Sequence, residues 1–321
     1  MTVTNDKIDP GEIAMATAPT TTFEPDSIED TARQVRATMR YVDEGDFVTR
    51  RYVSQGAELN TGTYSDHQVT IRDAMPIRDH FTLDTHGFQI AKVPTAVGDF
   101  HDKAGVEALY EREVEQAVMA LTGADKCVAR GWMIRTSADL SQRSQEKVEN
   151  YTHNGGVQPP AGEAHVDINT PTAHMMAKAT YEKHFPNGPG YKRFLISSFW
   201  RTFSPPPQDV PLALCDGRSS FGGEEKSNTL FVVDAFPEGE ELVRPVEGED
   251  QRIAATIFSH HPGHRWWYFS NMEADDVLLF KFHDSDHTRT WRCPHSAFID
   301  ASAAGANIRE SIEVRSVAFW E

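Results

Sequence analysis

The chain has few cysteines, no long apolar run and a deficit of positive charge. Its 321 residues include only three cysteines, and 31 basic residues stand against 48 acidic ones, for a formal net charge of −17. An odd number of cysteines without a CxxC spacing argues against a disulfide framework and indicates reduced thiols in a cytoplasmic protein. The acidic balance argues against a nucleic-acid partner and against binding to an anionic membrane surface.

The apolar stretches are too short to cross a bilayer. No window approaches the length of a membrane span, so no transmembrane helix is expected. The segment Met1–Asp6 lacks the basic and apolar regions of a secretory signal. Residues 1–30 are rich in threonine, proline and acidic residues, which predicts a disordered N-terminal arm. The remaining residues, 31–321, are expected to form a single domain.

Strand signals dominate the second half of that domain, and helix signals precede them. Helical spacing of apolar residues predicts a helix over 106–121 that ends at Gly123, and a shorter helix is expected over 30–41. Residues 81–90 are expected to form two strands around a glycine turn. The pattern predicts a mainly β fold with flanking helices, whose core is a double-stranded β-helix of the jelly-roll, cupin-like kind. We expect α/β support from 31–160 and the core from 161–321, with an insert within 169–250.

One short motif carries the chemistry. His165 and Asp167 lie two residues apart on an expected strand, so both side chains point to the same face. A second imidazole would complete the 2-His-1-carboxylate set that leaves coordination positions open on non-haem Fe(II). Chance alone predicts about two His-x-acid pairs in a chain with 14 histidines and 48 acidic residues, so the pair needs further support.

The third ligand stays open at this point. The downstream candidates are His260, His261, His264, His283, His287 and His295. His295 is attractive because Pro294 restricts the approach of the chain and an apolar strand follows. The histidines at 260–264 flank a Pro-Gly turn and could equally lie on the surface.

Near the C-terminus, Arg309 and Ser311 share a strand face and can together hold a carboxylate. A 2-oxo acid that chelates iron needs such an anchor at its far carboxylate. The alternative is that Arg309 forms surface ion pairs with neighbouring acidic residues. Three further segments are candidate cavity walls, although aromatic strands more often belong to the core: Phe199–Arg201, Trp266–Phe269 and Arg135.

Four segments, taken in order, resemble the CmcJ/NvfI-type oxygenases, a family that also contains the fungal gibberellin desaturase and the AsaB-like hydroxylase/desaturases. The segments are Ala164–Asp167; Trp200–Arg201 with Asp209–Asp216; His264–Trp266 with Met272 and Val277–Lys281; and Pro294–Phe298 with Arg309–Arg315. This resemblance implies a double-stranded β-helix that uses Fe(II), 2-oxoglutarate and O2. It carries over His165, Asp167 and His295 as the iron ligands.

The resemblance also favours Arg309 and Ser311 as the 2-oxoglutarate anchor, with Arg315 or Arg201 as residues that share this role. His283 departs from the family pattern, since an aromatic residue is expected there. The implied function is an Fe(II)/2-oxoglutarate-dependent dioxygenase that oxidises an unactivated C–H bond of a small, secondary-metabolite substrate by hydroxylation, desaturation or oxidative cyclisation.

Two rival functions remain. The first is an iron oxygenase that uses no 2-oxo acid, in which Arg309 binds a carboxylate of the substrate itself. The second is a cupin-like protein without enzymatic activity that binds zinc or no metal. The expected partner is a small molecule, with neither nucleic acid nor membrane, and a homodimer is left open.

Overall fold

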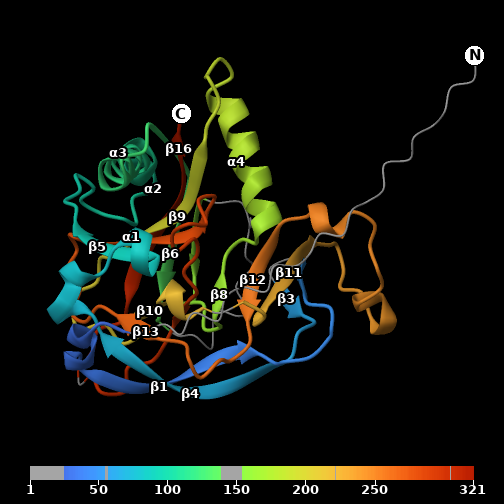
Figure 1. The fold of residues 1–321 in the computed structure, drawn as a ribbon, viewed down its shortest axis with the longest axis horizontal. Helices are drawn as coiled ribbons and strands as arrows, with labels where there is room; N and C mark the ends of the chain where they lie inside the picture. Colours follow the sequence, from blue (N-terminus) through green and yellow to red (C-terminus); the bar gives the residue numbers. More distant parts are fainter. Residues whose placement is uncertain (1–24, 55–56, 139–153, 221, 304) are drawn as a thin grey trace, which may run out of the picture.

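The computed structural model describes residues 25–54, 57–138, 154–220, 222–303 and 305–321. Within these residues the strands form a ten-stranded and a six-stranded sheet (Figure 1). In spatial order the larger sheet contains β1 (Gln34–Val42), β4 (Tyr64–Asp73), β13 (Trp266–Tyr268), β10 (Leu212–Cys215), β15 (His295–Ala297), β8 (His165–Val166), β12 (Ala254–Phe258), β11 (Glu225–Val232), β2 (Arg50–Ser54) and β3 (Ala57–Asn60). The smaller sheet contains β5 (Phe88–Lys92), β14 (Asp276–Asp284), β9 (Arg193–Thr202), β16 (Glu310–Trp320), β6 (Lys126–Thr136) and β7 (Asn154–Gln158).

From β6 onward the chain passes back and forth between the two sheets. Strands β14, β9, β16 and β6 are neighbours in the smaller sheet, and β13, β10, β15 and β8 are neighbours in the larger one. Two four-stranded layers wound in this way from one stretch of chain form a double-stranded β-helix. The predicted fold class is therefore confirmed.

A helical layer packs on one face of the smaller sheet (Figure 1). It consists of α2 (Lys103–Gly105), a π-helical turn η3 (Val106–Tyr110) and α3 (Glu111–Thr122). Four side chains of this layer are completely buried at helical spacing: Val106, Tyr110, Val114 and Val118. Gly123 ends the helix with φ of +70° and donates its N–H to Met119 O, because glycine adopts this conformation without steric cost. The helix predicted over 106–121 is confirmed.

Two local predictions are wrong. Residues 34–42 form strand β1 rather than a helix, since alternate residues such as Val35, Ala37 and Met39 are buried while their neighbours are exposed. Residues 83–86 form the helical turn α1 (Leu83–His86) before β5, with the Thr82 hydroxyl accepting a hydrogen bond from Thr85 N–H.

Helix α4 (Thr170–His184) was not expected from the sequence. The sequence does carry a signal for the N-terminus of this helix, because Asn169 is an N-cap residue and a proline stands in the first turn. The Asn169 side chain accepts a hydrogen bond from Thr172 N–H. The remaining helical turns among the described residues are η1 (Ser27–Thr31), η2 (Met75–His80), η5 (Gly217–Ser219), η6 (Gly239–Leu242) and η7 (Glu249–Gln251). No helix in the described part of the chain is both long and apolar enough to span a bilayer.

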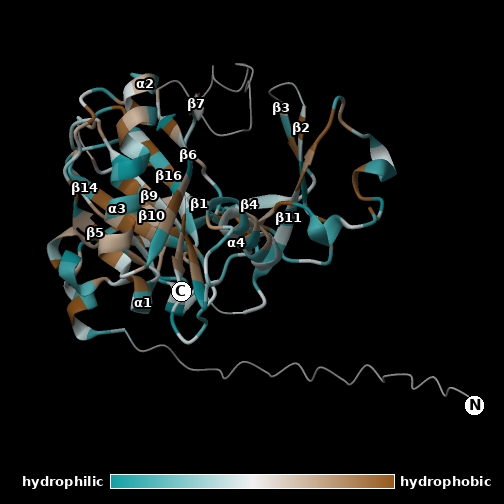
Figure 2. Cartoon of the chain, turned by 90° about the horizontal axis from the view of Figure 1, so that it is seen from above, coloured by the Kyte–Doolittle hydropathy of each residue, from teal (hydrophilic) through white to brown (hydrophobic). Residues whose placement is uncertain are grey.

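The expected domain boundaries need two corrections. The boundary at residue 160 divides the core, because β6 is one of its strands. The arm expected over 1–30 ends too late, since η1 is ordered helical structure and Glu29 within it is buried. Residues 1–24 of that arm lie outside the described residues. The range expected for an insert, 169–250, contains helix α4, which follows β8. It also contains strand β11, which lies near the end of the larger sheet that projects away from the two-sheet core (Figure 2).

Candidate metal centre and adjoining cavity

Two histidines distant in sequence meet on neighbouring strands of the larger sheet. His165 of β8 and His295 of β15 are direct partners in the antiparallel pairing. Their side chains lie on the same face, with ring centroids 4.4 Å apart. The sheet register therefore brings the two imidazoles together without any contribution from a flexible loop.

The backbone selects the tautomer of both rings. His165 Nδ1 lies 2.8 Å from Glu163 O, and His295 Nδ1 lies 3.1 Å from Cys293 O. A carbonyl oxygen only accepts hydrogen bonds, so each Nδ1 carries the proton and each Nε2 can offer a lone pair to a metal.

Asp167 completes the set. Its Oδ1 lies 3.1 Å from His165 Nε2 and 3.6 Å from His295 Nε2, and one ligand atom from each of the three residues lies within 4.8 Å of the others. Burial raises the pKa of this carboxyl, but the neighbouring groups, the Arg315 guanidinium foremost, lower its pKa to well below the usual range. The carboxylate is therefore ionised and able to bind a cation.

The other candidate third ligands lie elsewhere. His264 bonds to Tyr41 and contacts Glu224, and His283 stacks on Phe194 with ring centroids 5.7 Å apart. Among the described residues, His295 is the histidine that joins His165 and Asp167 in one group. The pairing of β8 with β15 is what brings His295, among the candidate histidines, beside His165 and Asp167.

A cavity of about 350 Å³, including its open mouth, adjoins the three side chains. Its apolar wall includes Trp200, Leu212 and Phe280. Its polar lining includes Arg135, Arg309 and Glu313, in addition to the metal-centre residues. Trp200 and Arg135 thus line the cavity as expected, whereas Trp266–Phe269 belongs to the buried hydrophobic core.

Arg309 brings a buried guanidinium with unpaired hydrogen-bond donors to this cavity. The residue is 1% exposed, and its Nε and Nη2 have no hydrogen-bond partner among the described residues. Its backbone N–H is held by Ser137 Oγ at 2.8 Å and Asp209 Oδ1 at 2.9 Å, and its guanidinium lies 5.7 Å from the centre of the Trp200 ring. Burial and the nearby Arg135 charge lower the pKa of Arg309 to about 9. A buried guanidinium with unpaired donors is a ready site for an anion.

The other two arginines proposed as co-substrate anchors are differently engaged. Arg201 donates to Tyr110 Oη at 2.9 Å and to two backbone carbonyls at 2.8 Å, and it does not line the cavity. Its assignment to the anchor is wrong, because neighbouring strand residues point to opposite faces and Trp200 takes the cavity side. Arg315 instead forms an ion pair with Asp167 Oδ2. Ser311 is buried on the same strand, with its Oγ 3.5 Å from Arg135 O.

Sequence reasoning missed Glu313 as a cavity residue, although the same two-residue alternation that pairs Arg309 with Ser311 continues to it. Glu313 Oε2 lies 3.9 Å from Arg135 Nε, and its Oε1 lies 3.4 Å from Arg315 Nε. It therefore stands between Arg135, which lines the cavity, and Arg315, which pairs with Asp167.

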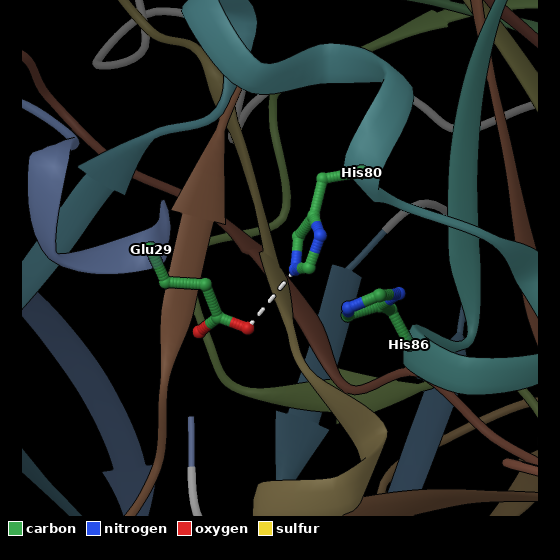
Figure 3. A group of neighbouring side chains, drawn as sticks. All are labelled: Glu29, His80 and His86. Atoms are coloured by element: carbon green, nitrogen blue, oxygen red, sulfur yellow. Dashed lines mark hydrogen bonds and ion pairs between the residues drawn. The ribbon is translucent and has the colours of Figure 1, made fainter. Parts of the chain in front are cut away.

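A second group of potential ligand atoms lies between Glu29, His80 and His86 (Figure 3). Glu29 Oε1 lies 3.2 Å from His80 Nε2, but Arg218 contacts the same oxygen at 3.0 Å and Arg265 contacts Oε2 at 2.7 Å. Both carboxylate oxygens are thus already paired with cations, which disfavours a metal ion between them.

The ring of His86 also has the wrong tautomer for a ligand in this group. Its Nδ1 accepts the Thr82 N–H at 3.1 Å, and burial lowers the pKa of the ring to about 3. The neutral ring therefore carries its proton on Nε2, which has no lone pair to offer. We interpret the group as an ion-pair network that ties Glu29 to Arg218 and Arg265.

Comparisons with known proteins identify the family of the chain. A family model described as "Oxidoreductase/YMDC permease-like domain" matches residues 39–319. The hydroxylase/desaturase CTB9 of Cercospora beticola is 30% identical over 80% of this chain and 78% of its own length. The Fe(II)/2-oxoglutarate-dependent dioxygenase nvfI of Aspergillus novofumigatus is 30% identical over 80% of this chain and 84% of its own.

The fold is shared with a solved structure. The iron and alpha-ketoglutarate-dependent endoperoxidase NvfI superposes with a TM-score of 0.69 at 24% identity, covering 89% of this chain and 98% of that one. A third relative in sequence is the hydroxylase/desaturase efuI of Hormonema carpetanum. It is 28% identical over 84% of this chain and 92% of its own length. The chain therefore belongs to the family of Fe(II)/2-oxoglutarate-dependent oxygenases that contains these hydroxylase/desaturases and NvfI.

Proposed function

We propose that the protein is a non-haem Fe(II)/2-oxoglutarate-dependent dioxygenase that oxidises a C–H bond of a small organic molecule. His165, Asp167 and His295 would hold the iron, and Arg309 with Ser311 would hold the far carboxylate of 2-oxoglutarate. The observation that carries the proposal is the convergence of the two Nε2 atoms and Asp167 Oδ1 beside a cavity that also receives Arg309.

The donor set fits iron(II). Two imidazoles and one carboxylate are the ligands of the non-haem iron oxygenases, which keep coordination positions open for other molecules. The Nδ1 contacts of His165 and His295 with backbone carbonyls orient both rings, as outer contacts commonly do at metal sites. Burial of Asp167 and His295 separates the centre from bulk water.

The unpaired donors of Arg309 fit the second carboxylate of a dicarboxylic 2-oxo acid. A guanidinium presents two parallel N–H groups to a carboxylate, and a buried cation without a partner gains most from such a contact. Ser311 lies two residues further on β16 and shares the face of Arg309. Arg135 stands beside them in the cavity lining.

The chain's own residues would bind, orient and exclude water. When bound, iron and 2-oxoglutarate supply oxidative decarboxylation by dioxygen and the oxidising power used on the substrate. Trp200, Leu212 and Phe280 give the cavity an apolar wall that suits a hydrophobic substrate and keeps water away from the reacting carbon. Relatives named hydroxylase/desaturase and endoperoxidase support an oxidation whose outcome depends on where the substrate carbon is placed.

The direct test is anaerobic. Adding Fe(II) and 2-oxoglutarate to the protein should produce the visible charge-transfer band of the chelate, and admitting oxygen should release succinate. A protein that binds iron without forming the band would point to an oxygenase that uses no 2-oxo acid. A protein that binds no iron would contradict the proposal.

The proposal extends to the organisation of the chain. We propose that residues 31–321 act as one oxygenase domain with a small-molecule substrate. A cytoplasmic location is supported by three free, buried cysteines, which suit a reducing compartment. A homodimer remains a prediction to be tested by light scattering.

A further inference from the structure

We propose that Arg315 is a positioning residue that keeps Asp167 bound to the metal through one oxygen only. The inference rests on the proposed iron site. It assigns to Arg315 a role different from holding 2-oxoglutarate.

The two oxygens of Asp167 face different partners. Oδ1 lies toward both imidazoles, 3.1 Å from His165 Nε2 and 3.6 Å from His295 Nε2. Oδ2 forms an ion pair with Nη2 of Arg315. The carboxylate is therefore oriented so that one oxygen serves the metal centre and the other is engaged by a cation of the protein.

Strand β6 has a β-bulge opposite Arg315 of β16. Val314 of β16 pairs with Trp132 of β6, but Ser316 pairs with Ala129, so two residues of β6 stand opposite Arg315. One of them is Gly131, with φ of +86°. Bulges of this kind bend a strand and re-aim side chains, and they are frequent beside active sites.

The guanidinium of Arg315 is also held from its other sides. Its Nε lies 3.4 Å from Glu313 Oε1, and its Cζ lies 5.9 Å from the centre of the Phe282 ring. Phe282 in turn stacks on His295, with ring centroids 5.5 Å apart and an interplanar angle of 13°. One aromatic ring therefore contacts a proposed metal ligand and the arginine that orients another.

The consequence concerns the number of free coordination positions. If the bound iron took six ligands, the three protein ligands would leave three positions, and a chelating 2-oxo acid together with dioxygen would need all of them. A carboxylate that bound through both oxygens would take one of these positions. By forming an ion pair with Oδ2, Arg315 prevents this loss.

The test measures whether one coordination position of the iron stays open for a diatomic ligand once 2-oxoglutarate is bound. Nitric oxide, a spectroscopic substitute for dioxygen, is titrated anaerobically into Fe(II)-loaded enzyme saturated with 2-oxoglutarate and followed by electron paramagnetic resonance. At saturating Fe(II) we expect Arg315→Gln to carry iron but to bind nitric oxide about 10- to 100-fold more weakly than the wild type, a loss of the size that removal of such outer contacts causes in metal affinity or activity. Arg315→Lys should recover part of this affinity.

Arg130→Lys is the matched control. Arg130 lies on β6 at the same bulge, but its guanidinium donates to Thr180 Oγ1 rather than to a metal-centre residue. We expect its nitric oxide affinity to equal that of the wild type. Circular dichroism establishes that each variant is folded, and if Arg315→Gln is not, the comparison of Arg315→Lys with Arg130→Lys carries the test.

The opposing results are distinct. Wild-type nitric oxide affinity of Arg315→Gln at saturating 2-oxoglutarate would overturn the proposal, even if more 2-oxoglutarate is needed to reach saturation, because that pattern belongs to a co-substrate anchor. Failure of the wild type itself to form the iron–2-oxoglutarate band would instead contradict the proposed function.

Discussion

His165 and His295 are direct partners across two neighbouring antiparallel strands, and each directs its Nδ1 at the backbone carbonyl two residues before it. The same local geometry is thus repeated on both strands. Because backbone contacts orient the two rings, the pair is arranged for metal binding before any metal arrives.

Removing a proposed ligand should abolish iron binding and turnover while the fold persists. We expect this of His165→Ala and of Asp167→Ala. Asp167→Ala should also lower the free energy of unfolding by roughly 1.5–3 kcal/mol, since Arg315 then keeps only Glu313 of its two carboxylate partners. Iron content after anaerobic loading, succinate release and urea unfolding measure the three effects. His184→Ala, at an exposed position, is the control, and iron retained at wild-type level by either ligand variant would remove the metal-site assignment.

Arg309→Ala should raise the 2-oxoglutarate requirement. Truncating one partner of a buried charge pair costs at least about 2 kcal/mol, so we expect the KM for 2-oxoglutarate to rise by roughly 30-fold or more. In the same variant, 2-oxoglutarate should no longer raise the Tm as it does in the wild type. Arg36→Ala, on the exposed side of β1, should leave both quantities unchanged. An unchanged requirement in Arg309→Ala would move the anchor to Arg135.

His283→Phe should keep iron binding and make the protein less sensitive to acid. Burial lowers the pKa of His283 from its ordinary 6.5 to about 3. Between these values the unfolded chain binds a proton that the folded chain does not, so stability falls as pH decreases, by up to about 1.4 kcal/mol per pH unit. Phenylalanine removes this contribution and can keep the stacking on Phe194.

Urea unfolding at pH 7 and pH 5 measures this difference. The variant should lose less stability than the wild type between the two values. Loss of iron in His283→Phe would mean that the third ligand has been wrongly chosen.

Glu29→Gln should destabilise the protein without changing its metal content. The substitution keeps the shape of the side chain but removes the charge shared by Arg218 and Arg265. Hydrogen bonds to charged groups contribute about 1.5–3 kcal/mol, and we expect a loss of that size. Metal analysis of the wild type should give one ion per chain. A second ion that disappears in Glu29→Gln would show that the Glu29 group is a metal site after all.

The secondary-structure predictions that the structure confirms rest on patterns of residues close together in the sequence. The helix over 106–121 was predictable because its apolar residues repeat at helical spacing and Gly123 follows directly. The short helix predicted over 30–41 is wrong because Val35, Ala37 and Met39 alternate with exposed residues, a two-residue period that buries one face of a strand. Helix α4 was missed because its small and polar residues form no clear apolar stripe, and only its start was marked.

The sequence by itself determined that His165 and Asp167 lie together, because two residues on one strand share a face whatever the rest of the chain does. It also determined that Arg309 and Ser311 point the same way. The tertiary structure alone decided that His295 completes the group, since this depends on which strand pairs with β8. It likewise decided that Arg201 faces the helical layer while Arg309 faces the cavity, because alternation defines two faces and only packing determines which of them becomes the interior.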